Sequence, residues 1–499
     1  MKTNREIFEK YADSATLDRI VSFNNLGAMW DSRSKEYASL VAVSQSDASL
    51  TFAQLDASVS KLRAALKEAG VKKGDNVGVL IPNGISFATA YLAVVTLGAV
   101  AVLLPPHLDE MTVFGCSMKF RLSALVYNAS LEDKLSIIRA KNPALVLVED
   151  TASSDALVPF EDVEPDAPCT VLFTGGTTGR SKGALLSHKA IMRGILNGCY
   201  GYPEVFNQRY FLVLPLTHVF GLVRNLLTSL YTGSAIHICR NNKDMFKEIA
   251  IFKPTEMIIV PALAEMALNL SKQFGKNMLG EDMKCIICGA ATVAPYLVRE
   301  YAKMGITLLP GYGLTESANL VSGNPEALLK PDSVGLIYEG TEYKIVDGEL
   351  WLKGENMMLG YIGEEEETAL SYRDGWFKTG DLVRMDEEGF LYITGRKKEI
   401  IVLASGENIS PAELENTFNS LDCVQDSLVQ EKDGALVIQI LPRMTTLKAL
   451  GVTDIEQYIK DQVAAVNATL PSFKRVGKVT VRTTDFVRSP SMKIVRDKN

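Results

Sequence analysis

The sequence contains no apolar run long enough to indicate a membrane span. Its longest run, from Ala90 to Leu104, is short for a span and is interrupted by Thr96 and Gly98. We expect a buried helix that ends near Gly98, followed by a buried strand that ends at Pro105-Pro106. The segment MKTNREIFEKYADSA lacks the apolar core of a signal peptide, so the sequence predicts a cytoplasmic protein without an integral membrane segment.

The sequence also lacks an excess of basic residues. Lysine and arginine number 52 against 59 acidic residues, and the net charge of −7 argues against nucleic-acid binding.

The seven cysteines are scattered and include only one closely spaced pair. Cys285 and Cys288 have CxxC spacing, but they lie in a run that is typical of a buried strand. Without a second pair, we expect buried thiols in a reducing compartment rather than a zinc site.

Short apolar runs that alternate with helical periodicity occupy much of the sequence before residue 330. This alternation predicts parallel sheets covered by helices. From about residue 333, alternating runs with glycine turns indicate a β-rich section, and the final stretch has its own helices and strands. We predict an α/β protein: a large N-terminal domain (1–395) of helix-covered β-sheets plus a β-rich subdomain, and a small α+β C-terminal domain (396–499). The apolar runs are 76–82, 124–128, 144–150, 209–216, 256–261 and 284–289.

Residues 173–183 read FTGGTTGRSKG, with four glycines, three threonines and one lysine. The stretch follows a strand-like run and precedes an expected helix, LSHKAIMRGILNG. We therefore predict a strand–loop–helix unit whose backbone N–H groups and hydroxyls surround phosphate oxygens. Ser181 before Lys182 excludes a Walker P-loop, and the absence of GxGxxG disfavours a dinucleotide fold. An ordinary turn between strand and helix is the alternative.

Together with six further motifs, this loop resembles the signature of the adenylate-forming superfamily. That superfamily includes acyl-CoA synthetases, peptide-synthetase adenylation domains and luciferases. The resemblance implies an AMP-forming acyl-CoA ligase that uses ATP, Mg²⁺ and coenzyme A, with a large adenylation domain and a small, mobile C-terminal lid. The further motifs are LPLTHVFG (214–221), GYGLTES (311–317), GELWLKGENMMLGY (348–361), GWFKTGDL (375–382), GRKKEIIVLASGENISPAELE (395–415) and PSMKIVR (490–496).

The resemblance also implies roles for individual residues in binding the nucleotide. Tyr312 would stack on adenine, and Asp381, reinforced by Arg396, would accept from the ribose hydroxyls. Glu316 would bind Mg²⁺ together with Thr174, because a carboxylate beside a triphosphate needs a hard cation between them. The full nucleotide-binding set comprises Thr174, Gly175, Gly176, Thr177, Thr178, Gly179, Lys182, Gly289, Ala290, Ala291, Tyr312, Gly313, Thr315, Glu316, Asp381, Arg396 and Lys493.

Several of these residues also have an ordinary structural interpretation. Tyr312 could be a core residue, although glycines on both sides leave it little to pack against. Asp381 could cap a turn, and Lys493 taken alone would be a surface lysine. His218, which by the resemblance lines the mouth of the acyl pocket, could equally be a packed histidine.

The resemblance implies two half-reactions. Lys493, Thr315 and His218 are the expected catalytic residues: Lys493 would neutralise charge as a carboxylate attacks the α-phosphate, and Thr315 would reach that phosphate. The C-terminal domain would then rotate about Lys398. Its loop Gly406-Glu407-Asn408 would bring pantetheine to the adenylate, which forms the thioester and AMP.

The sequence narrows the acid without identifying it. The segment His218-Val219-Phe220 lacks the aspartate that holds the ammonium group in amino-acid-activating members of the superfamily. We therefore expect a fatty or other apolar acid, with aryl acids as the alternative and coenzyme A or an acyl carrier protein as the acceptor. Gly175, Ser181 and Met492 depart from the common motifs, and a non-catalytic nucleotide-binding homologue is the remaining alternative.

Overall fold

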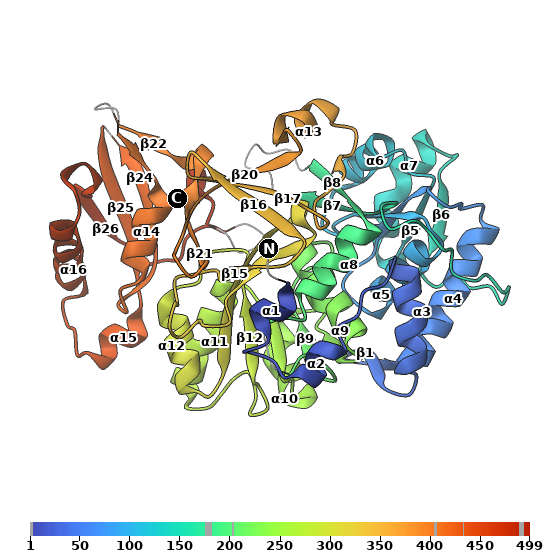
Figure 1. Cartoon of the computed structure of the whole chain (residues 1–499), viewed down its shortest axis with the longest axis horizontal. Coiled ribbons are helices and arrows are strands. Elements are labelled where there is room, and N and C mark those ends of the chain that lie inside the picture. Colours follow the sequence, from blue (N-terminus) through green and yellow to red (C-terminus); the bar gives the residue numbers. More distant parts are fainter. Residues whose placement is uncertain (1–2, 175–181, 202–203, 404–406, 433, 489–493) are drawn as a thin grey trace.

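The computed structural model describes residues 3–174, 182–201, 204–403, 407–432, 434–488 and 494–499. Two large sheets, each mostly parallel, form the N-terminal region, and a smaller antiparallel sheet follows them (Figure 1). The predicted α/β class is confirmed. The buried helix and strand predicted around Gly98 are present as α5 (Ile85–Thr96) and β4 (Val100–Leu103).

The nine-stranded sheet is parallel from β13 to β1, and antiparallel strands continue it at both edges. Its parallel strands are almost continuously apolar because helices cover both faces. Its order is β15 (Leu336–Ile337), β14 (Asn319–Gly323), β13 (Thr307–Leu314), β12 (Cys285–Cys288), β11 (Glu256–Ile259), β9 (Arg209–Leu212), β10 (Ala235–Ile238), β1 (Val41–Gln45) and β2 (Ala48–Thr51).

The seven-stranded sheet is parallel from β7 to β6, with two antiparallel strands at one edge. The apolar runs predicted as strands at 76–82, 124–128 and 144–150 form three of its strands. Its order is β18 (Gly360–Tyr361), β8 (Lys182–Ser187), β7 (Pro168–Thr174), β4, β3 (Asn76–Leu80), β5 (Ala124–Tyr127) and β6 (Val146–Glu149).

The sequence pattern predicted that the glycine-rich loop leads directly into a helix, and this prediction is wrong because a strand, β8, lies between them. The loop connects β7 to β8, which pair antiparallel from Pro168 with Ser187 to Thr174 with Lys182. Helix α8 (His188–Asn197) begins only after β8, where the Ser187 hydroxyl accepts a hydrogen bond from the backbone N–H of Ala190. The run Gly183-Ala-Leu-Leu therefore extends the sheet, and the loop closes a hairpin.

The β-rich section predicted after residue 333 forms a five-stranded sheet of β16 (Thr341–Val346), β17 (Glu349–Gly354), β20 (Trp376–Met385), β19 (Tyr372–Arg373) and β21 (Leu391–Arg396). Beyond it lie the pair β22 (Ile401–Val402) and β23 (Asn408–Ile409), and the sheet of β24 (Val424–Lys432), β25 (Ala435–Pro442) and β26 (Lys478–Val481). This last region has its own apolar core and lies at one end of the molecule (Figure 1).

The helices enclose these sheets. In the N-terminal region they are α1 (Asn4–Phe8), α2 (Ser14–Asp18), α3 (Leu26–Glu36), α4 (Phe52–Glu68), α5, α6 (Glu110–Lys119), α7 (Ser136–Lys141), α8, the π-helix η2 (Phe220–Leu227), α9 (Thr228–Tyr231), α10 (Met245–Phe252), α11 (Pro261–Phe274), α12 (Pro295–Lys303) and α13 (Glu365–Ser371). In the C-terminal region they are α14 (Pro411–Asn419), α15 (Met444–Ala449) and α16 (Ile455–Thr469). Short 3-10 turns are η1 (Ala129–Leu135), η3 (Asn242–Asp244), η4 (Thr315–Ser317), η5 (Lys397–Glu399), η6 (Ser472–Lys474) and η7 (Arg496–Lys498).

Candidate active site

The base of the glycine-rich hairpin lies against the turn that contains Glu316. The turn η4 packs against β7 and β8, and Tyr361 of β18 pairs with β8 through Ala184. The Tyr361 hydroxyl donates to Glu316 Oε1 over 2.7 Å, and Lys182 Nζ lies 4.9 Å from the centre of the Tyr361 ring. The fold thus brings Lys182 and Glu316, two residues predicted to contact phosphate and metal, to the same tyrosine.

Lys182 has a carboxylate partner in the acidic run at the start of α13. It forms an ion pair with Glu367, and the hydrogen bond from Lys182 lowers the pKa of that carboxyl. The run Glu364–Glu367 provides the N-cap and first turn of this helix, where carboxylates complement the helix dipole. The Lys182 ammonium is therefore charge-compensated before any phosphate binds.

A second cluster, formed by Tyr312, Asp381 and Arg396, joins the nine-stranded sheet to the five-stranded sheet. The Tyr312 hydroxyl donates to Asp381 Oδ2 over 2.6 Å, and Arg396 Nε donates to Asp381 Oδ1 over 2.8 Å. Asp381 is 2 % exposed and lies in β20 opposite Arg396 of β21, and its carboxylate bonds these two side chains rather than capping a turn. The carboxylate raises the pKa of Arg396, and burial beside Asp381 raises that of Tyr312.

The glycines that flank Tyr312 allow strand β14 to approach closely. A Cβ at Gly313 would lie 2.0 Å from the carbonyl oxygen of Asn319, and one at Gly311 would lie 3.0 Å from Leu320. Tyr312 itself is partly buried against the main apolar core. The expectation that it has little to pack against is therefore wrong, and its hydroxyl is fixed by Asp381.

The ends of β12 and β13 form the neighbouring part of the site. A Cβ at Gly289 would lie 2.9 Å from the carbonyl oxygen of Gly311 and 3.5 Å from the Phe220 ring. Ala290 has a left-handed backbone, with φ of 66°, and both Ala290 and Ala291 are exposed. His218 is half-buried immediately before η2, the helix that begins at Phe220.

The expected hinge and thiol-loop residues lie in the C-terminal third of the chain. Lys398 is exposed within η5, and its neighbour Lys397 donates to the buried Glu349 Oε2 over 2.9 Å. Asn408 pairs with Val402 in the short β22–β23 ribbon, directly after Glu407. Gly175, Gly176, Thr177, Thr178, Gly179, Gly406 and Lys493, and the departures Ser181 and Met492, lie outside the described residues.

The sequence motifs single out neither Tyr361 nor Glu367 as a residue of this site. Tyr361 ends a motif that was recognised as a whole, and only the pairing of β18 with β8 places its ring beside Lys182. Glu367 belongs to the acidic run at the start of α13, where a favourable interaction with the helix dipole is a sufficient local explanation. Neither role carries a local signal, since each depends on contacts between distant segments.

Within the part of the chain that the structure describes, no helix is long and apolar enough to cross a membrane. The same residues contain no cluster of three or more His, Cys, Asp or Glu side chains that could hold a metal ion. Cys285 and Cys288 are buried free thiols in β12, as predicted.

Comparison with known proteins identifies relatives over nearly the whole chain. Residues 30–362 match the family model "AMP-binding enzyme", and residues 398–499 match "AMP-binding enzyme C-terminal domain". The 4-coumarate–CoA ligase-like 6 of Arabidopsis thaliana is 29 % identical, covering 90 % of this chain and 85 % of the relative. The long-chain-fatty-acid–CoA ligase FadD13 of Mycobacterium tuberculosis is 24 % identical, covering 90 % and 92 %.

Solved structures show the same fold. The anthranilate CoA ligase AuaEII, determined in complex with anthranoyl-AMP, has a TM-score of 0.83 and 21 % sequence identity. The similarity covers 96 % of this chain and 97 % of that one. The overall fold is therefore shared over nearly the whole chain.

Proposed function

The chain belongs to the AMP-binding enzyme family and is an AMP-forming acyl-CoA ligase, and we propose that it activates an acid with an apolar acyl body. The observation that carries the site assignment is the convergence of two clusters. Lys182, Tyr361 and Glu316 lie at the base of the glycine-rich hairpin, and Tyr312, Asp381 and Arg396 lie at the end of β13.

In the proposed site, ATP lies between these two clusters. Its adenine would rest on Tyr312 and its ribose hydroxyls would donate to Asp381, whose position is already fixed by two donors. The phosphates would lie against Lys182 and the hairpin that begins at Thr174. Glu316 and Thr174 offer the hard oxygen ligands that Mg²⁺ prefers, and the bound ion would neutralise phosphate charge.

In the first half-reaction, the carboxylate of the acid attacks the α-phosphate, the acyl-adenylate forms and pyrophosphate leaves. Thr315 would donate to the α-phosphate, and Lys493 would stabilise the charge that develops on it. His218 would close the mouth of the acyl pocket. These roles follow from the resemblance of the motifs. Thr315 directly precedes Glu316 in η4, and His218 lies just before η2, whose Phe220 ring approaches Gly289.

In the second half-reaction, the thiolate of coenzyme A attacks the acyl carbonyl, the thioester forms and AMP leaves. We assign residues 396–499 to the domain that changes position between the two steps, with its pivot at Lys398. The exposure of Lys398 and the separate apolar core of the C-terminal region support this assignment. The loop Gly406-Glu407-Asn408 would then guide the pantetheine arm to the adenylate.

The surroundings of the acyl site favour a carboxylic acid without an α-ammonium group. Phe220 lies next to Gly289, and Ile287 and Leu309 line the space below them, so the walls are largely apolar. The relatives include one named as a long-chain-fatty-acid–CoA ligase and one named as 4-coumarate–CoA ligase-like, so their names do not point to a single acid. We therefore place apolar aliphatic acids first and aryl acids second.

Pyrophosphate exchange into ATP across a panel of acids tests this function. Exchange with apolar aliphatic or aryl acids, followed by thioester formation when coenzyme A is added, is the expected result. α-Amino acids serve as the matched negative class. ATP binding without exchange for any acid would contradict the proposed catalysis and would favour a binding protein.

A further inference from the structure

A small cavity lies below the candidate active site, on the sheet face that η2 covers. Its walls include Ile287 of β12, Leu309 and Gly311 of β13, and Leu320 of β14. Gly311 is also the residue that Gly289 approaches at the edge of the site. Because Ile287 and Leu309 precede these glycines by two residues, they lie about 7 Å deeper in the sheet. The cavity thus continues the acyl site inward.

Arg224 of η2 lines this cavity with a guanidinium group that is not fully hydrogen-bonded. The residue is 2 % exposed, and its enclosed Nε and Nη1 have no hydrogen-bond partner at normal distance among the described residues. Although burial acts in the opposite direction, the nearby Tyr210 hydroxyl and Glu256 carboxylate interact with the guanidinium and raise its pKa. An added Cβ at Gly198 would lie 3.2 Å from Arg224 Cδ, so the end of α8 fixes the aliphatic part of the side chain. A buried guanidinium stays charged, and donors without partners are costly.

Glu256 lies near Arg224 without satisfying it. In β11, Glu256 is directly opposite Tyr210 of β9 and Cys285 of β12, and both of its carboxylate oxygens are without partners among the described residues. Burial raises the pKa of the Glu256 carboxyl to about 7, although the Arg224 charge opposes this shift. Near neutral pH, Glu256 therefore balances the arginine charge only in part.

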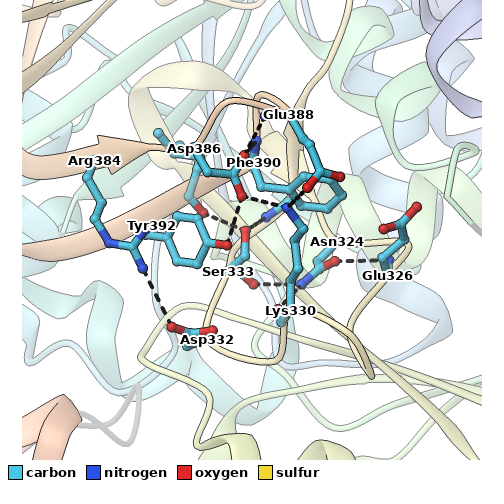
Figure 2. Close-up of polar contacts among 12 residues, drawn as sticks. Asn324, Glu326, Lys330, Asp332, Ser333, Arg384, Asp386, Glu388, Phe390 and Tyr392 are labelled. Carbon is cyan, nitrogen blue, oxygen red and sulfur yellow. Dashed lines mark hydrogen bonds and ion pairs between the residues drawn. The ribbon is translucent and has the colours of Figure 1, made fainter.

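A second polar wall residue, Asn324, differs from Arg224 because its amide is fully used. Its Nδ2 donates to the carbonyl oxygens of Lys330 and Ser333 over 2.8 and 2.9 Å, and its Oδ1 accepts from Glu326 N (Figure 2). Figure 2 shows this loop held further by Lys330, which bonds Asp386 and Glu388. Asn324 therefore shapes the cavity, whereas Arg224 has donors left for a ligand.

We propose that the acid activated by this enzyme carries an oxygen acceptor at the end remote from its reacting carboxylate, and that Arg224 binds this acceptor. The inference rests on the proposed ligase function, because it assigns Arg224 to the part of the acyl site that would hold the remote end of the acid. The space beside Arg224, about 20 Å³, has room for one water-sized group. A carbonyl or carboxylate oxygen fits it, whereas a further hydrocarbon segment does not.

The test uses three acids of matched length: a plain monocarboxylic acid, an acid with a keto group at the far end, and a dicarboxylic acid. We measure kcat/KM for acyl-CoA formation with the native enzyme, with Arg224→Leu and with the double variant Arg224→Gln/Glu256→Gln. The native enzyme should prefer an acceptor-bearing acid to the plain acid by roughly 10- to 100-fold. Both variants should lose that preference, and the keto and dicarboxylic acids reveal whether the acceptor is neutral or charged.

Arg33→Leu is the matched control, because Arg33 is also a buried arginine with Nε and Nη2 lacking partners among the described residues, yet it does not line the cavity. It should leave the preference unchanged. A native enzyme that prefers the plain acid, or an Arg224 variant that lowers kcat/KM equally for all three acids, overturns the inference and leaves the ligase function intact. If the enzyme activates other acids but none of the three test acids, the inference about Arg224 is also overturned. If it activates no acid at all, both the inference and the proposed ligase function are overturned.

Discussion

At the scale of single residues, the site depends on charges that are already paired before substrate arrives. Asp381 is bonded by Tyr312 and Arg396, and Lys182 is bonded to Glu367. Such pairs keep the side chains in one geometry, which lowers the cost of organising them around a nucleotide. The sequence motifs singled out Asp381, Arg396, Tyr312 and Lys182 as candidate site residues, but the partners of these side chains could be recognised only from the folded chain.

Asp381→Asn should weaken nucleotide binding while the fold is retained. The substitution keeps the size of the side chain but removes the negative charge that holds Arg396 and would accept from ribose. We expect KM for ATP to rise roughly 10- to 100-fold, which corresponds to the loss of hydrogen bonds to a charged group. Tyr312→Phe, which removes only one donor to this carboxylate, should have a smaller effect. An unchanged KM for ATP in Asp381→Asn would contradict the ribose assignment.

Lys493→Ala should separate the two half-reactions. We expect pyrophosphate exchange to fall by at least about 100-fold, because the cation proposed to stabilise the α-phosphate would be lost. Thioester formation from supplied acyl-adenylate and coenzyme A should be largely retained. Lys498→Ala, which alters another lysine of the same tail, is the control. Equal loss of both half-reactions would argue against a C-terminal domain that serves the steps in two positions.

At the scale of elements, the sequence predicted the buried strands well and the surroundings of the glycine-rich loop poorly. Apolar runs such as 76–82 and 256–261 became strands because a parallel sheet buries both faces. The run at 183–186 is too short for its periodicity to distinguish strand from helix. Pairing with β7 makes it a strand, and this contact is absent from the local sequence.

The start of α8 should make stability depend on pH. His188 is completely buried, its Nδ1 accepts from Leu26 N over 3.3 Å, and burial lowers its pKa to about 4. The folded state therefore favours neutral histidine. This contribution is complete above the unfolded pKa near 6.5 and is lost as pH falls toward 4, at up to about 1.4 kcal/mol per pH unit.

His188→Gln keeps an acceptor but cannot titrate, so its melting temperature should fall less steeply between pH 7 and pH 5. Thermal unfolding followed by circular dichroism at several pH values measures this slope. The exposed His107, replaced as His107→Gln, is the control and should behave as the native chain. An identical pH slope in His188→Gln would show that other groups govern acid sensitivity.

At the scale of the whole molecule, the C-terminal region is held against the N-terminal region by a buried ion pair. Arg443, 0 % exposed, donates to Glu265 of α11 over 2.8 and 3.3 Å and lies 3.8 Å from the ring of Tyr296. Arg299 of α12 also pairs with Asp422 over 2.7 Å. The sequence predicted the two regions, but it gave no indication of this contact, since Glu265 and Arg443 are far apart along the chain.

Breaking this pair should loosen the arrangement of the two regions. Arg443→Leu leaves Glu265 buried without its partner, which costs about 3–5 kcal/mol in comparable sites. We therefore expect distances between spin labels on α11 and α16, measured by pulsed electron resonance, to become broader. The double variant Glu265→Leu/Arg443→Leu replaces both charges by apolar groups and should restore a narrow distribution. If the single variant keeps the native distribution, the ion pair does not determine the position of the C-terminal region, and the smaller contacts such as Arg299 with Asp422 must hold it.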